Sequence, residues 1–202
     1  MRNDGDGEFG HTEAMPSIPL DSNAALIVVD VQRGFDDADF WGRRDNPDCE
    51  ANIARLIAGW TDHARPIVLV RHDSVKPDSP LDTDTPGNAF KEVVADAAYD
   101  ILVTKQVNSA FYGEPDLEAW LRERGVGQIV VCGIQTNMCV ETTARMGGNL
   151  GFDVLVPLDA CHTFDLEGVG GLRLSPEELT RATAVNLSGG GFARVVGTDD
   201  LV

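Results

Sequence analysis

Hydrophobic runs and helix-like repeats alternate along the chain. Residues 25–31 are almost continuously hydrophobic, which is typical of a strand in a parallel sheet that is covered on both faces. Residues 50–64 instead carry hydrophobic side chains at helical spacing, among them Ile53, Leu56 and Ile57. The two patterns recur to the end of the chain, so strands and helices are expected in turn.

This alternation predicts the fold class. We expect strands at residues 25–31, 66–70, 100–105, 128–132, 153–157 and 192–196. We expect helices at residues 50–64, 89–97, 114–125, 136–149 and 175–187, and a loop at residues 164–174. Such βαβ units indicate an α/β fold with three layers (α/β/α) around a mostly parallel sheet of about six strands. Residues 20–202 are long enough to form a single domain.

The composition restricts the possible binding partners but does not indicate the reaction. The 16 basic and 33 acidic residues give a formal net charge of −17, which argues against nucleic acid and anionic membranes as partners. No hydrophobic run approaches the roughly 20 residues that span a bilayer. Residues 1–19 are polar and glycine-rich, lack the hydrophobic segment of a signal peptide, and are expected to form a flexible arm. We therefore expect a cytoplasmic protein whose four cysteines are reduced.

Three chemically reactive residues end or follow three of the predicted strands. Asp30 ends the first strand, Lys105 ends the third, and Cys139 follows the fourth after the turn at Gly133. Ligands of open α/β sheets bind beyond the carboxyl ends of the strands, where these side chains should converge. A thiol at a helix start also faces unpaired N–H groups, which favour the thiolate.

Together the three side chains predict nucleophilic catalysis. Cys139 would attack a carbonyl, Asp30 would move the proton, and Lys105 would supply positive charge. The backbone N–H groups of Ile134 and Cys139 could stabilise the oxyanion. Each residue alone has an ordinary interpretation: a small buried thiol, a turn cap and a solvated strand end. Their convergence favours the catalytic interpretation.

The sequence also resembles a known family. Residues 25–32, 104–105 and 131–140 resemble the motifs of the isochorismatase-like cysteine hydrolases, which include nicotinamidase and N-carbamoylsarcosine amidohydrolase. The similarity runs over about residues 23–196. It implies a Rossmann-like fold of the isochorismatase type, an Asp30–Lys105–Cys139 triad, a cis peptide between Gly133 and Ile134, and a homo-oligomer, either a dimer or a tetramer.

One departure from the family concerns metal binding. The nicotinamidase metal site is an Asp-x-His motif with a further histidine downstream. Asp73 matches the aspartate, but Val75 stands where the first histidine would be, and the next histidine is His162. We therefore expect no metal and no cofactor.

Residues near the strand ends are candidates for substrate contact, and each has a structural alternative. Aromatic residues after the first and third strands could form a hydrophobic lid or only pack locally. Arg71 could bind a substrate carboxylate or an internal aspartate, and His72 shares that ambiguity. The predicted substrate-binding residues are Phe35, Trp41, Arg71, Asn108, Phe111 and Gln135.

The predicted function is therefore a metal-independent cysteine hydrolase. Its substrate would be a small carbonyl compound with an amide or a carbamoyl/ureido C–N bond, cleaved through an acyl-cysteine intermediate. One alternative is hydrolysis of a vinyl ether, as in isochorismatases. Another is a catalytically silent protein that binds a ligand or acts as a scaffold. The sequence does not identify the substrate.

Overall fold

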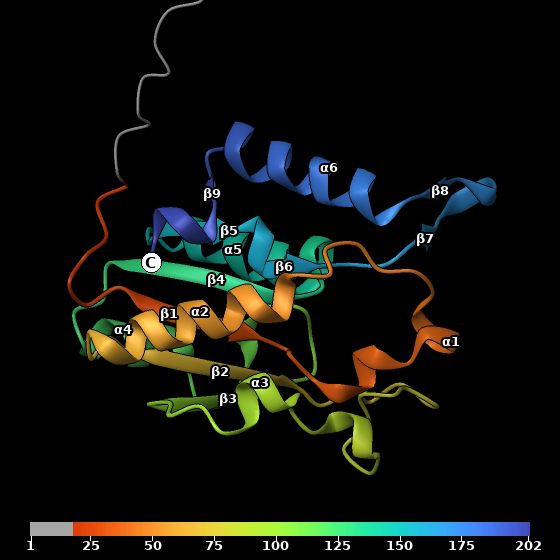
Figure 1. The fold of residues 1–202 in the computed structure, drawn as a ribbon, viewed down its shortest axis with the longest axis horizontal. Coiled ribbons are helices and arrows are strands. Elements are labelled where there is room, and N and C mark those ends of the chain that lie inside the picture. The colour runs from red at the N-terminus through yellow and green to blue at the C-terminus, as the bar shows by residue number, and fades with distance from the viewer. Residues whose placement is uncertain (1–17) are drawn as a thin grey trace, which may run out of the picture.

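The computed structural model describes residues 18–202, and its centre is a parallel sheet (Figure 1). The order of the strands is β3-β2-β1-β4-β5-β9, and the short β6 pairs with the end of β4 to give seven strands. The strands are β1 (Ala25–Val29), β2 (Ile67–His72), β3 (Ile101–Lys105), β4 (Gln128–Ile134), β5 (Asp153–Pro157), β6 (Cys161–His162) and β9 (Arg194–Val196). Every pairing within this sheet is parallel.

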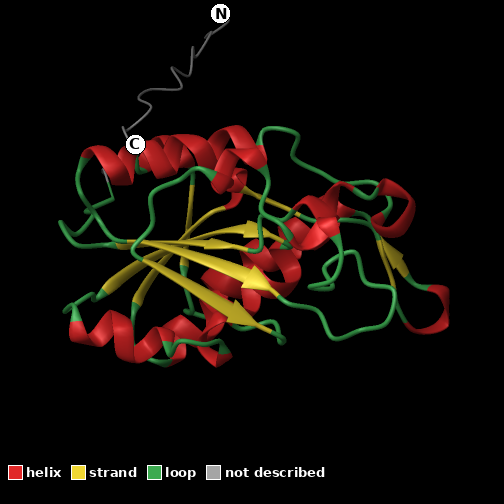
Figure 2. Cartoon of the chain, turned by 90° about the horizontal axis from the view of Figure 1, so that it is seen from below, coloured by secondary structure: helices red, strands yellow, loops and turns green. Residues whose placement is uncertain are grey.

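Helices cover both faces of the sheet (Figure 2). They are α1 (Ala38–Trp41), α2 (Cys49–Asp62), α3 (Glu92–Ala95), α4 (Leu117–Glu123), α5 (Glu141–Asn149) and α6 (Pro176–Gly189). The α2 helix contacts β1, β2, β4 and α3, whereas α5 contacts β4, β5 and α6. This arrangement confirms the predicted three-layer α/β/α fold.

The centre of the sheet is hydrophobic on both sides. All five residues of β1 are buried, as are all seven of β4. Trp60 of α2 is fully buried beside them, and its indole N–H donates to the carbonyl of Ala24 at 2.8 Å. Because β1 and β4 are buried along their whole length, side chains at the ends of these strands have little freedom to move.

Several element boundaries differ from the predictions. The first strand ends at Val29, because Asp30 has a φ of 53° and leaves the extended conformation. The fourth strand continues two residues further than predicted, through Ile134. A π-helical turn at Thr136–Val140 precedes α5. The predicted loop at residues 164–174 contains a small antiparallel hairpin of β7 (Leu166–Glu167) and β8 (Arg173–Leu174), too short to show a periodic pattern.

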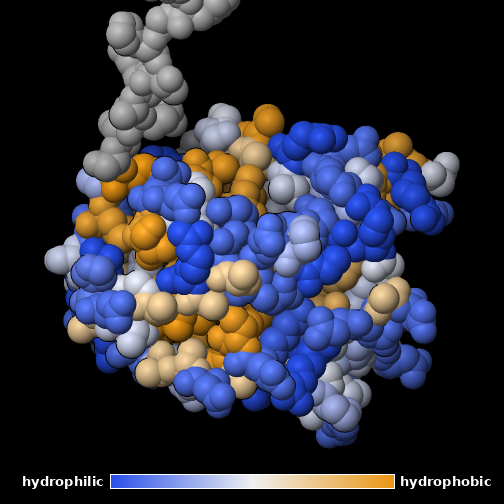
Figure 3. All heavy atoms as spheres, viewed as in Figure 1, coloured by the Kyte–Doolittle hydropathy of each residue, from blue (hydrophilic) through white to orange (hydrophobic). Residues whose placement is uncertain are grey.

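The predicted arm lies mostly outside the described residues. Of its 19 residues, only the last two are described: Ile18 packs against the core, and Pro19 accepts a hydrogen bond from Gln128 at 3.1 Å. Within residues 18–202, no helix combines the length and hydrophobicity needed to cross a membrane. The face seen in Figure 3 is largely hydrophilic, with separate hydrophobic patches.

Candidate active site

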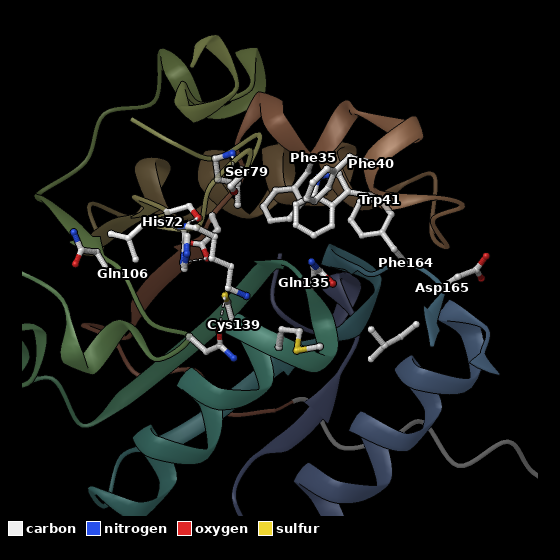
Figure 4. A pocket seen from close by; sticks show the side chains of 18 residues that line it. Phe35, Phe40, Trp41, His72, Ser79, Gln106, Gln135, Cys139, Phe164 and Asp165 are labelled. Atoms are coloured by element: carbon white, nitrogen blue, oxygen red, sulfur yellow. Dashed lines mark hydrogen bonds and ion pairs between the residues drawn. The ribbon is translucent and has the colours of Figure 1, made fainter. Parts of the chain in front are cut away.

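A cavity of about 460 Å³ opens at the carboxyl edge of the sheet (Figure 4). Asp30, His72 and Cys139 line its polar end, and one ligand atom from each lies within 4.8 Å of the others. They come from the ends of β1 and β2 and from the turn after β4. The structure thus brings together Asp30 and Cys139, which were predicted as catalytic residues, with His72, for which the sequence left a substrate contact and an internal role open.

Lys105 completes this group from β3. Its ammonium group lies 2.6 Å from Oδ2 of Asp30, and both side chains are fully buried. Oδ1 of Asp30 has no hydrogen-bond partner among the described residues. A buried carboxylate oxygen without a partner is costly. Asp30 also lines the cavity, so this residue joins unused hydrogen-bonding capacity to a place where a ligand could bind.

The electrostatics of the pair keep Lys105 charged. Burial opposes the charge, but the carboxylate of Asp30 outweighs it, so the pKa of Lys105 is raised. Burial, followed by the charge of Asp30, raises the pKa of Cys139 well above its usual range, although Lys105 acts in the opposite direction. The resting group is therefore a thiol. A helix start alone predicts the reverse, but Cys139 is only 8% exposed.

The backbones of β1 and β4 approach each other closely where Asp30 and Gly133 end or follow the paired residues. Gly133 has a φ of +124°, and a Cβ atom there would lie 2.1 Å from the carbonyl oxygen of Val29. Only glycine fits this contact. It brings the peptide just before Asp30 against the strand that carries the Cys139 turn, and Asp30 itself adopts the left-handed conformation that aspartate tolerates.

The predicted cis peptide between Gly133 and Ile134 is wrong. The cis bond lies one residue further on, between Ile134 and Gln135. The reason is the length of β4: Gly133 and Ile134 still pair in the ladder with Cys161 and His162 of β6, so the turn begins later.

Aromatic side chains form the opposite wall of the cavity. Phe164 stacks on Phe35 and on Trp41, and the rings of Phe35 and Trp41 are tilted against each other; the centroids lie 4.9 to 6.1 Å apart. The indole N–H of Trp41 donates to the carbonyl of Gly34 at 2.8 Å, which fixes the ring. Phe35 and Trp41 were predicted as substrate contacts, whereas Phe164 was not. Phe164 follows β6 directly, and no local pattern in the sequence reveals where it lies.

Two further predicted contacts also line the cavity. Asn108 places Oδ1 at 3.9 Å from Sγ of Cys139. Gln135 lies beside the π-helical turn, with Oε1 at 3.4 Å from the hydroxyl of Thr163. Both residues lie within reach of a molecule bound at the polar end.

Arg71 and Phe111 are not among the residues that line the cavity, so their predicted substrate contacts are not supported. Arg71 donates to both oxygens of Asp73, at 2.7 and 3.0 Å, which matches the internal role left open by the sequence. Phe111 stacks on Phe152, with centroids 5.9 Å apart. Phe111 thus packs against the hydrophobic side chain of Phe152 and does not face the cavity.

The residues around Asp73 do not fit the metal site of nicotinamidases. The carboxylate of Asp73 is neutralised by Arg71 and also accepts from Asn88 at 3.0 Å. Val75 is 67% exposed and offers no ligand. Asp30, His72 and Cys139 form a second group of possible ligands. The ammonium of Lys105 lies 2.6 Å from Asp30 and 3.1 Å from His72, where its charge would repel a cation.

The fold and the site define a class: an α/β protein with a thiol, a carboxylate and an ammonium at the carboxyl edge of a parallel sheet. The Isochorismatase domain model matches residues 24–171, so the chain belongs to the isochorismatase family. The family and its relatives indicate a hydrolase.

Individual relatives agree with this assignment. The isochorismatase family protein YrdC of Bacillus subtilis is 34% identical, over 91% of this chain and 96% of its own length. Nicotinamidase 3 of Arabidopsis thaliana is 31% identical, over 91% of this chain and 89% of its own. A solved isochorismatase-family structure from Chromobacterium violaceum is 39% identical, with a TM-score of 0.84, over 93% of this chain and 96% of its own.

Proposed function

We propose that this chain is a cysteine hydrolase that cleaves the C–N bond of a small amide or of a carbamoyl or ureido compound through an acyl-cysteine intermediate. The observation that carries the proposal is the buried Asp30–Lys105 pair: Asp30 lines the cavity together with Cys139, and its Oδ1 has no hydrogen-bond partner among the described residues. The amide part of the proposal draws on Nicotinamidase 3, a relative named for amide hydrolysis.

Acylation begins from the protonated thiol. As Sγ of Cys139 bonds to the substrate carbonyl carbon, its proton passes to Oδ1 of Asp30. The oxyanion forms near the first helical turn, where N–H groups including that of Cys139 lack helical partners. The C–N bond then breaks, and Asp30 returns the proton to the leaving nitrogen.

Deacylation reverses the proton movement. Water attacks the acyl carbon while Asp30 accepts one of its protons. The C–S bond breaks, the acid leaves, and the proton returns to Sγ. Lys105 remains charged throughout because Asp30 and the developing thiolate both favour the ammonium.

The experiment is a substrate panel in which release of ammonia or amine reports C–N cleavage, and mass spectrometry of the products reports cleavage of the vinyl ether. It contains small primary amides, ureido acids and a vinyl ether, and it compares the wild type with Cys139→Ala. Cys161→Ala is the matched control, because Cys161 is also buried but is not among the residues that line the cavity, and its thiol donates to the carbonyl of Pro157 at 3.4 Å. We expect C–N cleavage by the wild type and by Cys161→Ala, and none by Cys139→Ala.

Two results would contradict the proposal. Cleavage of amides by Cys139→Ala at the wild-type rate would remove the thiol from the reaction. Turnover of the vinyl ether alone would replace amide chemistry with the isochorismatase type.

A further inference from the structure

His72 is the second acceptor for the buried ammonium of Lys105. Its Nδ1 lies 3.1 Å from Nζ, and the two residues are register partners on the neighbouring strands β2 and β3. An ammonium offers three hydrogens, of which the carboxylate of Asp30 takes one. If His72 were removed, Asp30 would be the one remaining side chain among the described residues with an oxygen or nitrogen acceptor at hydrogen-bonding distance from the fully buried ammonium.

The contact fixes the protonation of the ring. An ammonium only donates hydrogen bonds, so Nδ1 of His72 must accept and the imidazole carries its hydrogen on Nε2. Burial, followed by the charge of Lys105, lowers the pKa of His72, which agrees with a neutral ring. The ring lies at the cavity beside Cys139 (Figure 4).

The backbone of His72 is held by dedicated side chains. Buried Gln32 accepts from the N–H of His72 at 2.8 Å and donates to its carbonyl at 3.0 Å. Asn88 donates to the same carbonyl at 3.2 Å. A peptide clamped on both sides does not move with the loop that follows it. The ring is therefore placed as precisely as the strand ends around it.

We propose that His72 is a positioning residue whose neutral imidazole holds the ammonium of Lys105 between Asp30 and Cys139, and whose protonation releases it. The catalytic role of His72 rests on the proposed function, whereas its contact with Lys105 does not.

The surroundings explain why protonation would act as a release. A protonated ring loses its acceptor and places a positive charge 3.1 Å from the ammonium. Oδ2 of Asp30, 4.0 Å from Nδ1, would then attract the imidazolium in competition with Lys105. The charged or titratable groups around the ring are Asp30 after β1, Lys105 of β3, Cys139 of the π-helical turn, and Asp73 and Lys76 after β2.

Two substitutions test the hydrogen-bond acceptor and the volume of the ring separately. His72→Asn keeps an acceptor near the position of Nδ1 but does not titrate, whereas His72→Leu keeps volume without an acceptor. The probe is 4-nitrophenyl acetate, whose burst of total 4-nitrophenol, protonated and ionised together, reports acylation between pH 5 and 9. We expect His72→Leu to slow the burst about ten- to a hundredfold at pH 8, and we expect this gap to narrow on the acid side, where protonation removes the same acceptor from the wild type. We expect His72→Asn to stay near the wild-type rate at pH 8 and to lose the wild-type decline on the acid side.

A second measurement does not need turnover. Nitrogen-15 NMR of the ring should show Nε2 protonated and Nδ1 bare in the wild type, and Lys105→Met should raise the pKa of His72 by removing the neighbouring charge. This readout also keeps the inference testable if His72→Leu fails to fold. If the wild type gives no acyl adduct while the NMR result holds, the proposed function fails and the His72 contact stands.

Three results would overturn the inference. They are a burst profile of His72→Leu that superimposes on the wild type, equal losses in His72→Asn and His72→Leu, and a ring protonated on Nδ1.

Discussion

Two buried lysines of this protein hold carboxylates in different ways. Lys91, just before α3, donates to Asp36 and to Glu50, each at 2.7 Å. Arg44 adds two hydrogen bonds of 2.7 Å to Glu50. The oxygens of Glu50 are therefore fully used within the protein, and none of these four residues lines the cavity.

The region around Lys105 differs because it leaves a hydrogen-bond acceptor without a partner. Lys105 meets a single carboxylate, and one oxygen of Asp30 has no partner among the described residues. That oxygen and the thiol of Cys139 both belong to residues that line the cavity. The comparison teaches that a buried ion pair by itself says little about function. An ion pair with spare hydrogen-bonding capacity at a cavity indicates a reactive site.

The largest expected effect comes from replacing each lysine by methionine. Lys105→Met should lower the rate of C–N cleavage on the order of a thousandfold or more, because the triad acts as a unit. Lys91→Met should leave the rate within about threefold and instead lower the free energy of unfolding by about 3 kcal/mol. Steady-state kinetics and urea unfolding of both variants measure the two effects. A comparable loss of rate in both variants would end the distinction between the two lysines.

The next effect concerns the spare oxygen. Asp30→Asn preserves the size of the side chain but removes the base, so cleavage should fall about 100- to 10,000-fold. Asp36→Asn, on the Lys91 side, is the matched control and should remain active. The comparison is made on kcat/KM at pH 7.5, with folding checked by circular dichroism. Near-normal activity of Asp30→Asn would mean that another group moves the proton.

A third prediction tests the close contact that places Asp30 beside the Cys139 turn. Gly133→Ala should cost roughly 3 kcal/mol of stability, because its Cβ would lie 2.1 Å from the carbonyl oxygen of Val29. Gly151→Ala is the control: its φ is +85°, but the added Cβ meets no atom within 4 Å, so a cost of about 1 kcal/mol is expected. Thermal unfolding measures both variants. Equal costs would show that the strands adjust to the extra atom.

The smallest effect concerns pH and the Lys91 region. Burial opposes the charge of Glu50, but Arg44 and Lys91 outweigh it and lower its pKa below its usual range. A lowered folded-state pKa gives stability above the unfolded value of about 4.3, and that stability is lost as the pH falls further. Glu50→Gln should therefore be about 1–2 kcal/mol less stable than the wild type at pH 7. The gap should close below about pH 4, because the wild type then loses the same contribution.

Urea unfolding at pH 7, 5 and 3 measures this gap. A difference in stability that is constant with pH would contradict the electrostatic origin of the effect, and a large loss of activity in Glu50→Gln would make its region part of the site.

The sequence predicts the part of this site that depends on strand ends. Hydrophobic runs end at Asp30 and Lys105, and a parallel sheet brings such ends to one edge. Register is harder to read, so the pairing of His72 with Lys105 was not predicted. Phe164 reaches the cavity from a distant segment, and Phe111 turns away to meet Phe152. Contacts of this kind depend on three-dimensional packing that no local pattern encodes.

The most direct test of the central claim is to locate the acyl group. The wild type is mixed with 4-nitrophenyl acetate, quenched in acid within the burst, and analysed by intact mass and peptide mapping. The account predicts an acetyl group on Cys139 approaching one per chain, absent from Cys139→Ala and strongly reduced in Lys105→Met. Acetylation spread over surface lysines with Cys139 unmodified, or an undiminished adduct in Lys105→Met, would contradict it.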